Sequence, residues 1–524
     1  MSLKDTVEKK PWVGWVLFLL TVGVVYLLGV FSSTIVERRT ESSLVNKPKI
    51  KINNLEPRNE VWGINYPREY ETYMETKSMD FRSKYNGSAM IDMLDEYPAL
   101  VILWAGYKFS QDYNQARGHY YAVEDIRNTL RTGAPMNGKH SPMPNTCWTC
   151  KSPDVPRKMK EIGIAEFYSG HWEERGSDII NPIGCADCHD ENTMKLKITR
   201  PALIEAFERQ GKDITKATHQ EMRTLVCAQC HVEYYFNSDK PKKGVPYLTF
   251  PWDNGTTAEE IEEYFDDINF KDYTHQLSKA PIIKAQHPGY ETYTKSIHYQ
   301  RGVSCADCHM PYKSEGGVKF TDHKIQSPLN NIANSCQVCH RESEEDILKS
   351  VYNNMDRVLH NRGKLEEILV KTHLEAEFAW KQGATEEQMK DVLLDIRHAQ
   401  WRWDYAAAAH GAAFHAPVEI LRVVGTGIEI AQEARMKIRS VLTELGYTKE
   451  IPIPDVSTKE KAQKYIGVDL PKLRAEKKLF LDTVVPKWLD EAEKRESKMP
   501  QYDQAVNAEP KSKEKEQTAS MLNK

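Results

Sequence analysis

The sequence predicts a mainly α-helical fold, in which a body with few and short strands is followed by long C-terminal helices. Beyond residue 345, apolar residues recur at the spacing of one helix face. Between about residues 60 and 345 the chain is instead rich in Pro, Gly, Asp and short segments. Only 40% of the 524 residues are hydrophobic and the mean hydropathy is −0.61. We therefore expect something besides aliphatic side chains to fill the core.

The N-terminal segment 12–31 is an uninterrupted run without a charged residue, and lysines precede it. Its length is near the roughly 20 residues that a membrane-spanning helix needs. An Ala-x-Ala-like cleavage site is missing, so both a signal peptide and a retained signal anchor stay open for residues 1–31. Either form predicts export from the cytoplasm, with residues 32–60 as a linker.

The charge pattern argues against nucleic acid as a partner. The formal net charge is −4 and the isoelectric point is near 6.5. No stripe of Lys and Arg is interleaved with aromatic residues, as a nucleic-acid-binding face would require.

The ten cysteines form five C-x-x-C pairs with none left over. Disulfides are common in exported proteins, but this uniform spacing indicates another use. The pairs are Cys147/Cys150, Cys185/Cys188, Cys227/Cys230, Cys305/Cys308 and Cys336/Cys339.

In four pairs a histidine follows directly: His189, His231, His309 and His340. C-x-x-C-H is the attachment motif of c-type haem, since the cysteines form thioethers and the histidine binds iron. Zinc sites also use C-x-x-C pairs but do not require that histidine. The sequence therefore predicts haem at these four pairs.

Lys151 stands where a fifth histidine is expected, in the motif 147–151. A lysine amine binds iron only when deprotonated, which requires a desolvated site close to the metal's charge. The alternative is a disulfide or zinc half-site, with Lys151 as a surface charge. Four haem pairs leave Cys147/Cys150 without a partner pair for zinc, and a lysine motif is unexpected in a purely conducting protein. We therefore predict a distinct haem at this pair.

One lysine motif beside four histidine motifs closely resembles the ammonia-forming pentahaem cytochrome c nitrite reductases, specifically their catalytic subunit. The resemblance runs from about residue 60 to about residue 490. It takes in the segments 130–135, 150–155, 230–236, 284–288 and 398–403. It implies five covalently bound haems c in a pentahaem catalytic region over residues 61–345, and the periplasmic six-electron reduction of nitrite to ammonium.

The resemblance also implies the catalytic residues. Lys151 is the proximal ligand of the active haem, and the opposite iron face is open to nitrite. Arg131, Tyr234 and His287 line that face. A guanidinium suits the nitrite anion, while histidine and tyrosine donate hydrogen bonds and protons as N–O bonds break.

The other four haems are expected to carry two histidines each. By resemblance, His119 is the distal ligand of the third haem, His298 of the fifth, His323 of the second and His415 of the fourth. His410 lies close to His415 in the sequence and is the second choice for the fourth haem.

A calcium ion beside the active haem is a further implication of the resemblance. Glu233 and Gln286 are its ligands by side chain, and Tyr234 and Lys284 by backbone carbonyl. Oxygen donors suit a hard cation, although no EF-hand loop is present. A second calcium has no residues assigned to it.

The region 346–504 predicts long helices with one apolar face. Its apolar positions are Met389, Val392, Leu393, Ile396, Trp403, Leu421, Val424, Ile428, Ala431, Ile438 and Leu442. Such a face packs either on the haem-binding body or on a second subunit, and the resemblance favours a homodimer. Residues 505–524 are charged and lack apolar periodicity, which predicts a disordered tail.

Two rival functions remain. A non-catalytic multihaem electron-transfer cytochrome has no use for an open iron face, so Lys151 argues against it. Oxidases of hydroxylamine and related compounds have a tyrosine cross-link and more haem motifs than this chain. For the reductase, the resemblance implies a membrane-bound multihaem quinol dehydrogenase or a soluble cytochrome as the electron donor.

Overall fold

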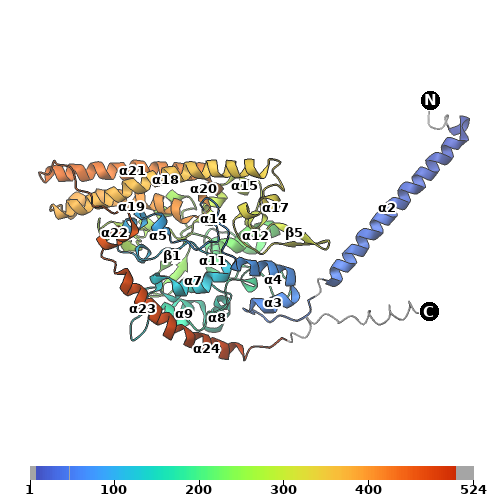
Figure 1. Ribbon diagram of the computed structural model, residues 1–524, viewed down its shortest axis with the longest axis horizontal. Helices are drawn as coiled ribbons and strands as arrows, with labels where there is room; N and C mark the ends of the chain where they lie inside the picture. Colours follow the sequence, from blue (N-terminus) through green and yellow to red (C-terminus); the bar gives the residue numbers. More distant parts are fainter. Residues whose placement is uncertain (1–6, 46–47, 86, 503–524) are drawn as a thin grey trace.

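The computed structural model describes residues 7–45, 48–85 and 87–502. The apolar N-terminal run lies within one helix, α2 (Pro11–Val45), which projects away from the rest of the molecule in Figure 1. Residues Pro11–Arg38 are long and apolar enough to cross a membrane, and their most apolar window is 0% buried. The predicted tail at 505–524 lies outside the described residues.

The body is built from short helical segments. Its α-helices are α3 (Asn59–Asn65), α4 (Pro67–Met74), α5 (Met93–Glu96), α6 (Ala99–Leu103), α7 (Ala122–Asn128), α8 (Asp154–Ile162), α9 (Ile164–Tyr168), α10 (Cys185–Cys188), α11 (Pro201–Arg209), α12 (His219–Ala228), α13 (Ala258–Asp267), α14 (Gly289–Thr294), α15 (Ile297–Gln300), α16 (Cys305–His309) and α17 (Ile332–Ser335). Short 3-10 turns lie between them: η1 (Glu75–Lys77), η2 (Lys108–Ser110), η3 (His119–Tyr121), η4 (Leu130–Thr132), η5 (Asn145–Trp148), η6 (Trp172–Arg175), η7 (Ile214–Lys216) and η8 (Pro328–Asn330).

The strands form three antiparallel two-stranded ribbons. They pair β1 (Tyr235–Asn237) with β2 (Tyr247–Thr249), β3 (Tyr273–Thr274) with β4 (Pro281–Ile282), and β5 (Tyr312–Glu315) with β6 (Val318–Thr321). In the first ribbon Phe236 lies opposite Leu248. The predicted mainly α-helical fold with few and short strands is therefore confirmed.

The long helices pack together along one edge of the molecule (Figure 1). They are α18 (Glu344–Lys381), α19 (Glu386–Ala408) and α21 (Pro417–Glu444), with the short α20 (Ala412–His415) before the last. The first begins at Ser343, whose side chain accepts a hydrogen bond from the Asp346 amide. Acidic residues fill its first turn, which stabilises the positive end of the helix dipole.

The apolar face of these helices is buried within the chain. Eight of the predicted positions are at most 1% exposed: Met389, Val392, Ile396, Trp403, Val424, Ala431, Ile438 and Leu442. The other three, Leu393, Leu421 and Ile428, are partly buried against the same core. A dimer through these helices would therefore have to use their other faces.

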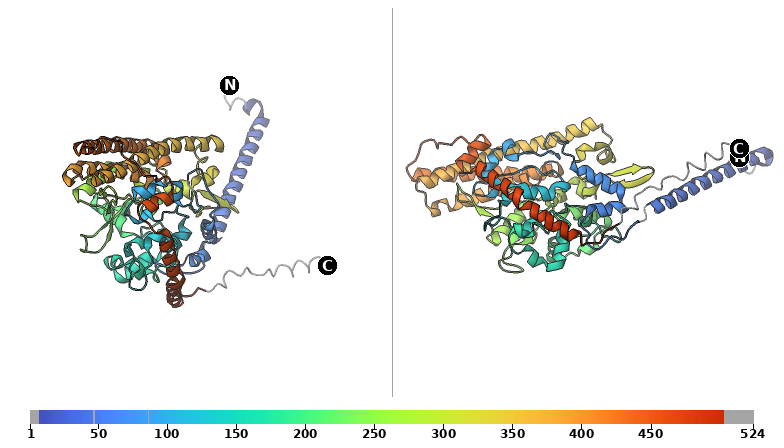
Figure 2. Two further views of the ribbon diagram at one scale, coloured as in Figure 1. Left: turned by 60° about the vertical axis from the view of Figure 1, so that its left-hand side comes forward. Right: turned by 60° about the horizontal axis from the view of Figure 1, so that its bottom comes forward.

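The C-terminal helices α22 (Lys459–Tyr465), α23 (Leu470–Thr483) and α24 (Val485–Glu496) return across the body, as the right-hand view of Figure 2 shows. Phe480 and Trp488 pack in one cluster with Trp148, which belongs to the lysine motif. The rings of Trp148 and Trp172 stack with centroids 4.9 Å apart. The end of the chain thus supports the segment that carries Lys151.

Candidate haem-binding and catalytic site

Each C-x-x-C pair lies in or beside a short helical turn. The second and fourth pairs lie inside α10 and α16, and the others flank or overlap η5, α12 and α17. Residues three apart face the same side of such a turn. All ten cysteines are free of disulfides. Each pair therefore presents two thiols to one side, as thioether attachment to haem requires.

Cys339 of the fifth motif lies closer to the surface than the other cysteines. It is exposed, whereas the other nine cysteines are partly buried. Its neighbours Val338 and His340 are exposed as well. The motif lies in the link between α17 and α18, and such connecting segments run over the surface of a protein. The predicted attachment point at Cys339 therefore lies at the surface of the chain.

The lysine motif differs locally from the histidine motifs. The amides of His189, His231 and His340 each donate to the carbonyl of the first cysteine of their motif, at 2.9 Å. The Lys151 amide instead donates to the carbonyl of Trp148, three residues back, at 3.0 Å. The side chain at position 151 consequently leaves a tighter turn.

Three of the predicted histidine ligand pairs, each joining residues far apart in the sequence, have facing rings. The ring centroids are 6.2 Å apart in His189–His323 and 6.3 Å apart in both His298–His340 and His309–His415. Two imidazoles that bind one ion from opposite sides through metal–nitrogen bonds of about 2 Å have centroids about 6 Å apart. These pairs therefore fit a haem iron between their rings.

The second ring nitrogens support the same fit. Nδ1 faces a backbone carbonyl oxygen in three rings: His189 at 2.9 Å, His309 at 2.7 Å and His323 at 2.9 Å. Metal-binding histidines commonly donate this N–H to such an acceptor, which leaves Nε2 for the metal. The buried Nδ1 of His415 has no hydrogen-bond partner in the described chain.

His231 has two imidazole neighbours. Enclosure by surrounding protein and then the imidazole of His119 lower the pKa of His231 to about 4. The ring of His287 lies 6.1 Å away, because the Tyr290 amide donates to the His231 carbonyl and holds that segment close. His410 lies 5.8 Å from His287, whereas His415 is the histidine beside His309.

Arg131, Tyr234 and His287 lie within electrostatic reach of the lysine motif. Burial raises the pKa of the Cys147 thiol to about 12, and the nearby cations Lys151 and Arg131 act in the opposite direction. Burial raises the pKa of Tyr234 well above its usual value, with smaller contributions from the thiols of Cys147 and Cys150. Burial and neighbouring imidazoles lower the pKa of His287, with Lys151 contributing. The site thus gathers two cations, a phenol and an imidazole.

The proximity of cysteine thiols orders the five motifs in space. The thiols of Cys150 and Cys230 lie close enough to shift each other's pKa, as do those of Cys227 and Cys305. Cys188 also influences Cys227, and Cys308 lies within electrostatic reach of both cysteines of the last pair. The first, third, fourth and fifth motifs therefore form a row, with the second motif beside the third.

The predicted calcium ligands also come together. Glu233 is 0% exposed; its Oε2 accepts from the Gln286 amide at 2.7 Å, while Oε1 has no partner among the described residues. The Gln286 side chain reaches the Lys284 carbonyl at 2.9 Å. An unpartnered buried carboxylate oxygen beside an amide and a carbonyl fits a hard cation. The described residues contain no cluster of three or more His, Cys, Asp or Glu that suits a metal, as zinc would need.

Arg200 supports the lysine motif but carried no signal in the sequence. It is 1% exposed, and its guanidinium donates to the carbonyls of Thr149 and Ser152, at 2.6 and 2.9 Å. It also pairs with Asp187 of the second motif at 2.5 Å. Arg200 therefore ties the turn around Lys151 to the neighbouring haem motif.

Replacing Arg200 with Gln is expected to lower the free energy of unfolding by about 3–5 kcal/mol, because Asp187 is left as an uncompensated buried charge. The matched control is Arg209→Gln, whose ion pair with Asp253 is exposed; such pairs contribute less than about 1 kcal/mol. Thermal unfolding measures both. Equal losses in the two variants would contradict the bracing role.

Tyr107 is a second neighbour of the site that the sequence did not indicate. It lies near both Gln286 and Arg131. Its ring stacks on Phe109 and Tyr273, with centroids 5.3 and 4.7 Å apart. Nothing in the spacing around it resembles a chemical motif, so only the fold reveals it.

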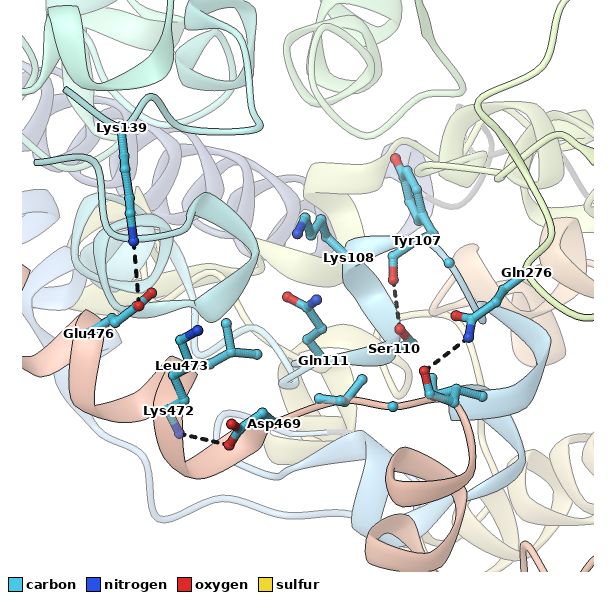
Figure 3. A pocket seen from close by; sticks show the side chains of 14 residues that line it. Tyr107, Lys108, Ser110, Gln111, Lys139, Gln276, Asp469, Lys472, Leu473 and Glu476 are labelled. Carbon is cyan, nitrogen blue, oxygen red and sulfur yellow. Dashed lines mark hydrogen bonds and ion pairs between the residues drawn. The ribbon is translucent and has the colours of Figure 1, made fainter.

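Tyr107 also lines a surface pocket of about 480 Å³ (Figure 3). Lys108, Lys139 and Lys472 contribute cations to this pocket, and Lys139 pairs with Glu476 at 3.5 Å. The pocket brings solvent close to the predicted substrate face.

Comparisons with known proteins show the family and the fold. The sequence profile of the cytochrome c552 family matches residues 58–501. The cytochrome c-552 of Bacteroides fragilis YCH46 is 58% identical over 92% of this chain and 97% of its own, and that of Aliarcobacter butzleri is 48% identical over 91% and 95%. The cytochrome c nitrite reductase of Desulfovibrio desulfuricans ATCC 27774, with two calcium sites in its catalytic subunit, superposes with a TM-score of 0.71. It is 31% identical, over 81% of this chain and 91% of its own.

Proposed function

The chain belongs to the cytochrome c552 family, and on that basis we propose that it reduces nitrite to ammonium with six electrons and eight protons, releasing two waters. The proposed site is a c-type haem held by Cys147, Cys150 and Lys151. The observation that carries the proposal is the gathering of Arg131, Tyr234 and His287 around the one motif that ends in lysine. The similar solved structure is itself a nitrite reductase.

The residues around Lys151 have complementary tasks. Haem iron, when bound, supplies the redox chemistry and the coordination position for the substrate nitrogen. The Arg131 guanidinium attracts the anion and orients its oxygens through charge-assisted hydrogen bonds. His287 and Tyr234 donate hydrogen bonds, and protons, to oxygens that leave as water.

Four further haems with two histidines each form the proposed electron supply. Three of the proposed ligand pairs have ring separations that suit one iron, namely His189–His323, His298–His340 and His309–His415. His231 with His119 is the fourth pair. The row of neighbouring thiols leads from the last motif to the lysine motif, which supports stepwise delivery of electrons to one site.

A calcium ion held by Glu233, Gln286 and the carbonyls of Tyr234 and Lys284 is also proposed. Replacing Glu233 with Gln is expected to remove one equivalent of calcium per chain, because the buried oxygen without a partner loses its charge. Elemental analysis of the purified protein measures this, with the exposed Glu208→Gln as control.

Stability gives a second measure of that calcium. Chelation is expected to destabilise the wild type by about 3 kcal/mol relative to calcium at 100 times its dissociation constant. The Glu233 variant should be insensitive to the chelator. A variant that keeps its calcium and its chelator response would contradict this ligand assignment.

The bulk of the protein is proposed to be periplasmic, with α2 as signal peptide or anchor. A retained anchor would tie the reductase to the membrane, near a membrane-bound multihaem quinol dehydrogenase; a soluble cytochrome is the other proposed donor. N-terminal sequencing of the mature protein distinguishes the two forms, because a start downstream of Phe31 rules out the anchor.

We propose that two copies of the chain form a homodimer through the outer surfaces of their long helices. Val418 and Met436 of α21 are 81% and 63% exposed, and Leu394 of α19 is 47% exposed. Exposed apolar side chains of this kind fit a second subunit. Sedimentation of the wild type beside Met436→Glu tests this, and a monomeric wild type would overturn it.

Ammonium formation tests the enzymatic proposal. The anaerobic purified protein, supplied with nitrite and a strong artificial reductant, is expected to yield one ammonium per nitrite with six electrons consumed. The rival electron-transfer cytochrome would accept electrons but leave nitrite unchanged. Mass spectrometry of the same sample counts the attached haems, with five expected.

A further inference from the structure

The turn that carries Arg131 is fixed on one side by Asp112. Its Oδ2 accepts the Thr129 hydroxyl and the Leu130 amide, both at 2.8 Å. The Thr129 oxygen in turn accepts from the Arg131 amide at 3.3 Å and from its Nε at 3.2 Å. The carboxylate therefore acts on the guanidinium through a single hydroxyl.

Lys477 fixes the same turn from the C-terminal helix α23. Its side chain is buried, and Nζ donates to the Arg127 carbonyl at 3.0 Å and to the Thr132 hydroxyl at 2.9 Å. The Thr132 hydroxyl reaches the Thr129 carbonyl at 3.0 Å. These contacts hold the two ends of the segment that contains Arg131.

The Arg131 guanidinium is left free to bind an anion. Its central carbon lies 4.2 Å from the centre of the Phe109 ring, which fixes the plane of the group. Within the described chain, Arg131 donates side-chain-directed hydrogen bonds through its backbone amide and through Nε. Neither terminal nitrogen of the guanidinium takes part in one. The two terminal nitrogens are thus available for a two-oxygen anion such as nitrite.

Burying the amine of Lys477 costs free energy, because the amine loses its contact with water. Burial lowers the pKa of Lys477 to about 7, and Asp112 opposes that shift. An apolar residue of similar length would fill the space without this desolvation. Asp112, Leu130 and Lys477 line one cavity of about 310 Å³, so the two charged groups face the turn from a shared space.

We propose that Lys477 and Asp112 are positioning residues for Arg131, which hold its guanidinium in the orientation that binds nitrite. This inference rests on the proposed nitrite reduction. It assigns to the C-terminal helix α23 a part in substrate binding, through the turn that carries Arg131.

The expected signature is a change in binding of the anion. In Lys477→Met, the KM for nitrite should rise about tenfold while kcat stays within about twofold, because an interaction shared by bound substrate and transition state is weakened. Hydroxylamine is uncharged near neutral pH and does not need the guanidinium, so its KM should stay within about twofold.

The test compares holoprotein variants that keep all haems. Lys477→Met is paired with Lys478→Met, an exposed neighbour on the same helix, whose nitrite KM should be unchanged. Thr129→Val removes the hydroxyl that links Asp112 to Arg131 and should reproduce the Lys477 effect, which keeps the test valid if one variant fails to fold.

Two outcomes would overturn the inference: an unchanged nitrite KM in both variants, Lys477→Met and Thr129→Val, or an equal rise for nitrite and hydroxylamine, which indicates general loosening. A wild-type protein that does not reduce nitrite would instead refute the proposed function. Optical titration with nitrite separates the two failures, because binding by the oxidised wild type can be measured without turnover.

Discussion

Replacing Lys151 with histidine is expected to leave the haem count at five and to lower nitrite turnover by at least tenfold. The variant converts the odd motif into the form of the other four, so covalent attachment through Cys147 and Cys150 should persist. The ligand opposite the substrate changes, and axial ligand identity is a main determinant of haem reactivity. Activity and haem content are measured on the same preparation.

The local structure explains why histidine should not substitute. The Lys151 amide donates a hydrogen bond to the carbonyl of Trp148. In three of the histidine motifs, the histidine amide instead donates to the carbonyl of the first cysteine. A shorter imidazole would start from a turn that Arg200 and the Trp148–Trp172 stack hold in place. The amine is also more basic than imidazole, so the electron donation to the metal differs.

The control for this variant is Lys195→His, an exposed lysine in the loop after the second motif. It should leave activity and the electronic spectrum of the haems unchanged. If Lys151→His also keeps wild-type turnover and spectrum, Lys151 has no special role and the proposed site is wrong.

Arg131→Gln is expected to reduce kcat/KM for nitrite by about 10²–10³-fold, because a charge-assisted, bidentate hydrogen-bonding contact to the anion is lost. The glutamine amide can still donate a hydrogen bond to the buried Thr129 hydroxyl, so the free energy of unfolding should hardly change. Steady-state kinetics at several nitrite concentrations measure the change.

Arg474→Gln is the matched control for that variant, because Arg474 is an exposed arginine on α23. Its kcat/KM should equal that of the wild type. An Arg131 effect below about twofold would mean that the guanidinium does not bind the substrate.

Local patterns in the sequence predicted much of the fold. The long helices follow from apolar periodicity, and positions such as Ile396 and Val424 are buried as their spacing indicates. Periodicity could not say what covers that face, because packing within the chain and between subunits use the same pattern. The structure places the face inside the chain.

The candidate site was only partly readable from the sequence. The haem motifs are recognisable because covalent attachment demands a fixed spacing. Spacing does not reveal depth, since Cys339 is exposed although its motif has the same pattern as those of the partly buried cysteines. The partner histidines depended on resemblance. Tyr107, Arg200 and Lys477 act through contacts between distant segments, for example the bond from Lys477 to Thr132 across 345 positions. No local pattern encodes such contacts, since they exist only once the chain has folded.

The most direct test of the central claim is a nitrite titration of the oxidised wild-type protein, followed by electron paramagnetic resonance. The presence of one lysine motif predicts that one haem in five changes its signal, with a stoichiometry of one nitrite per chain. Five unchanged signals, each from an iron with two histidine ligands, would contradict an open substrate face at Lys151.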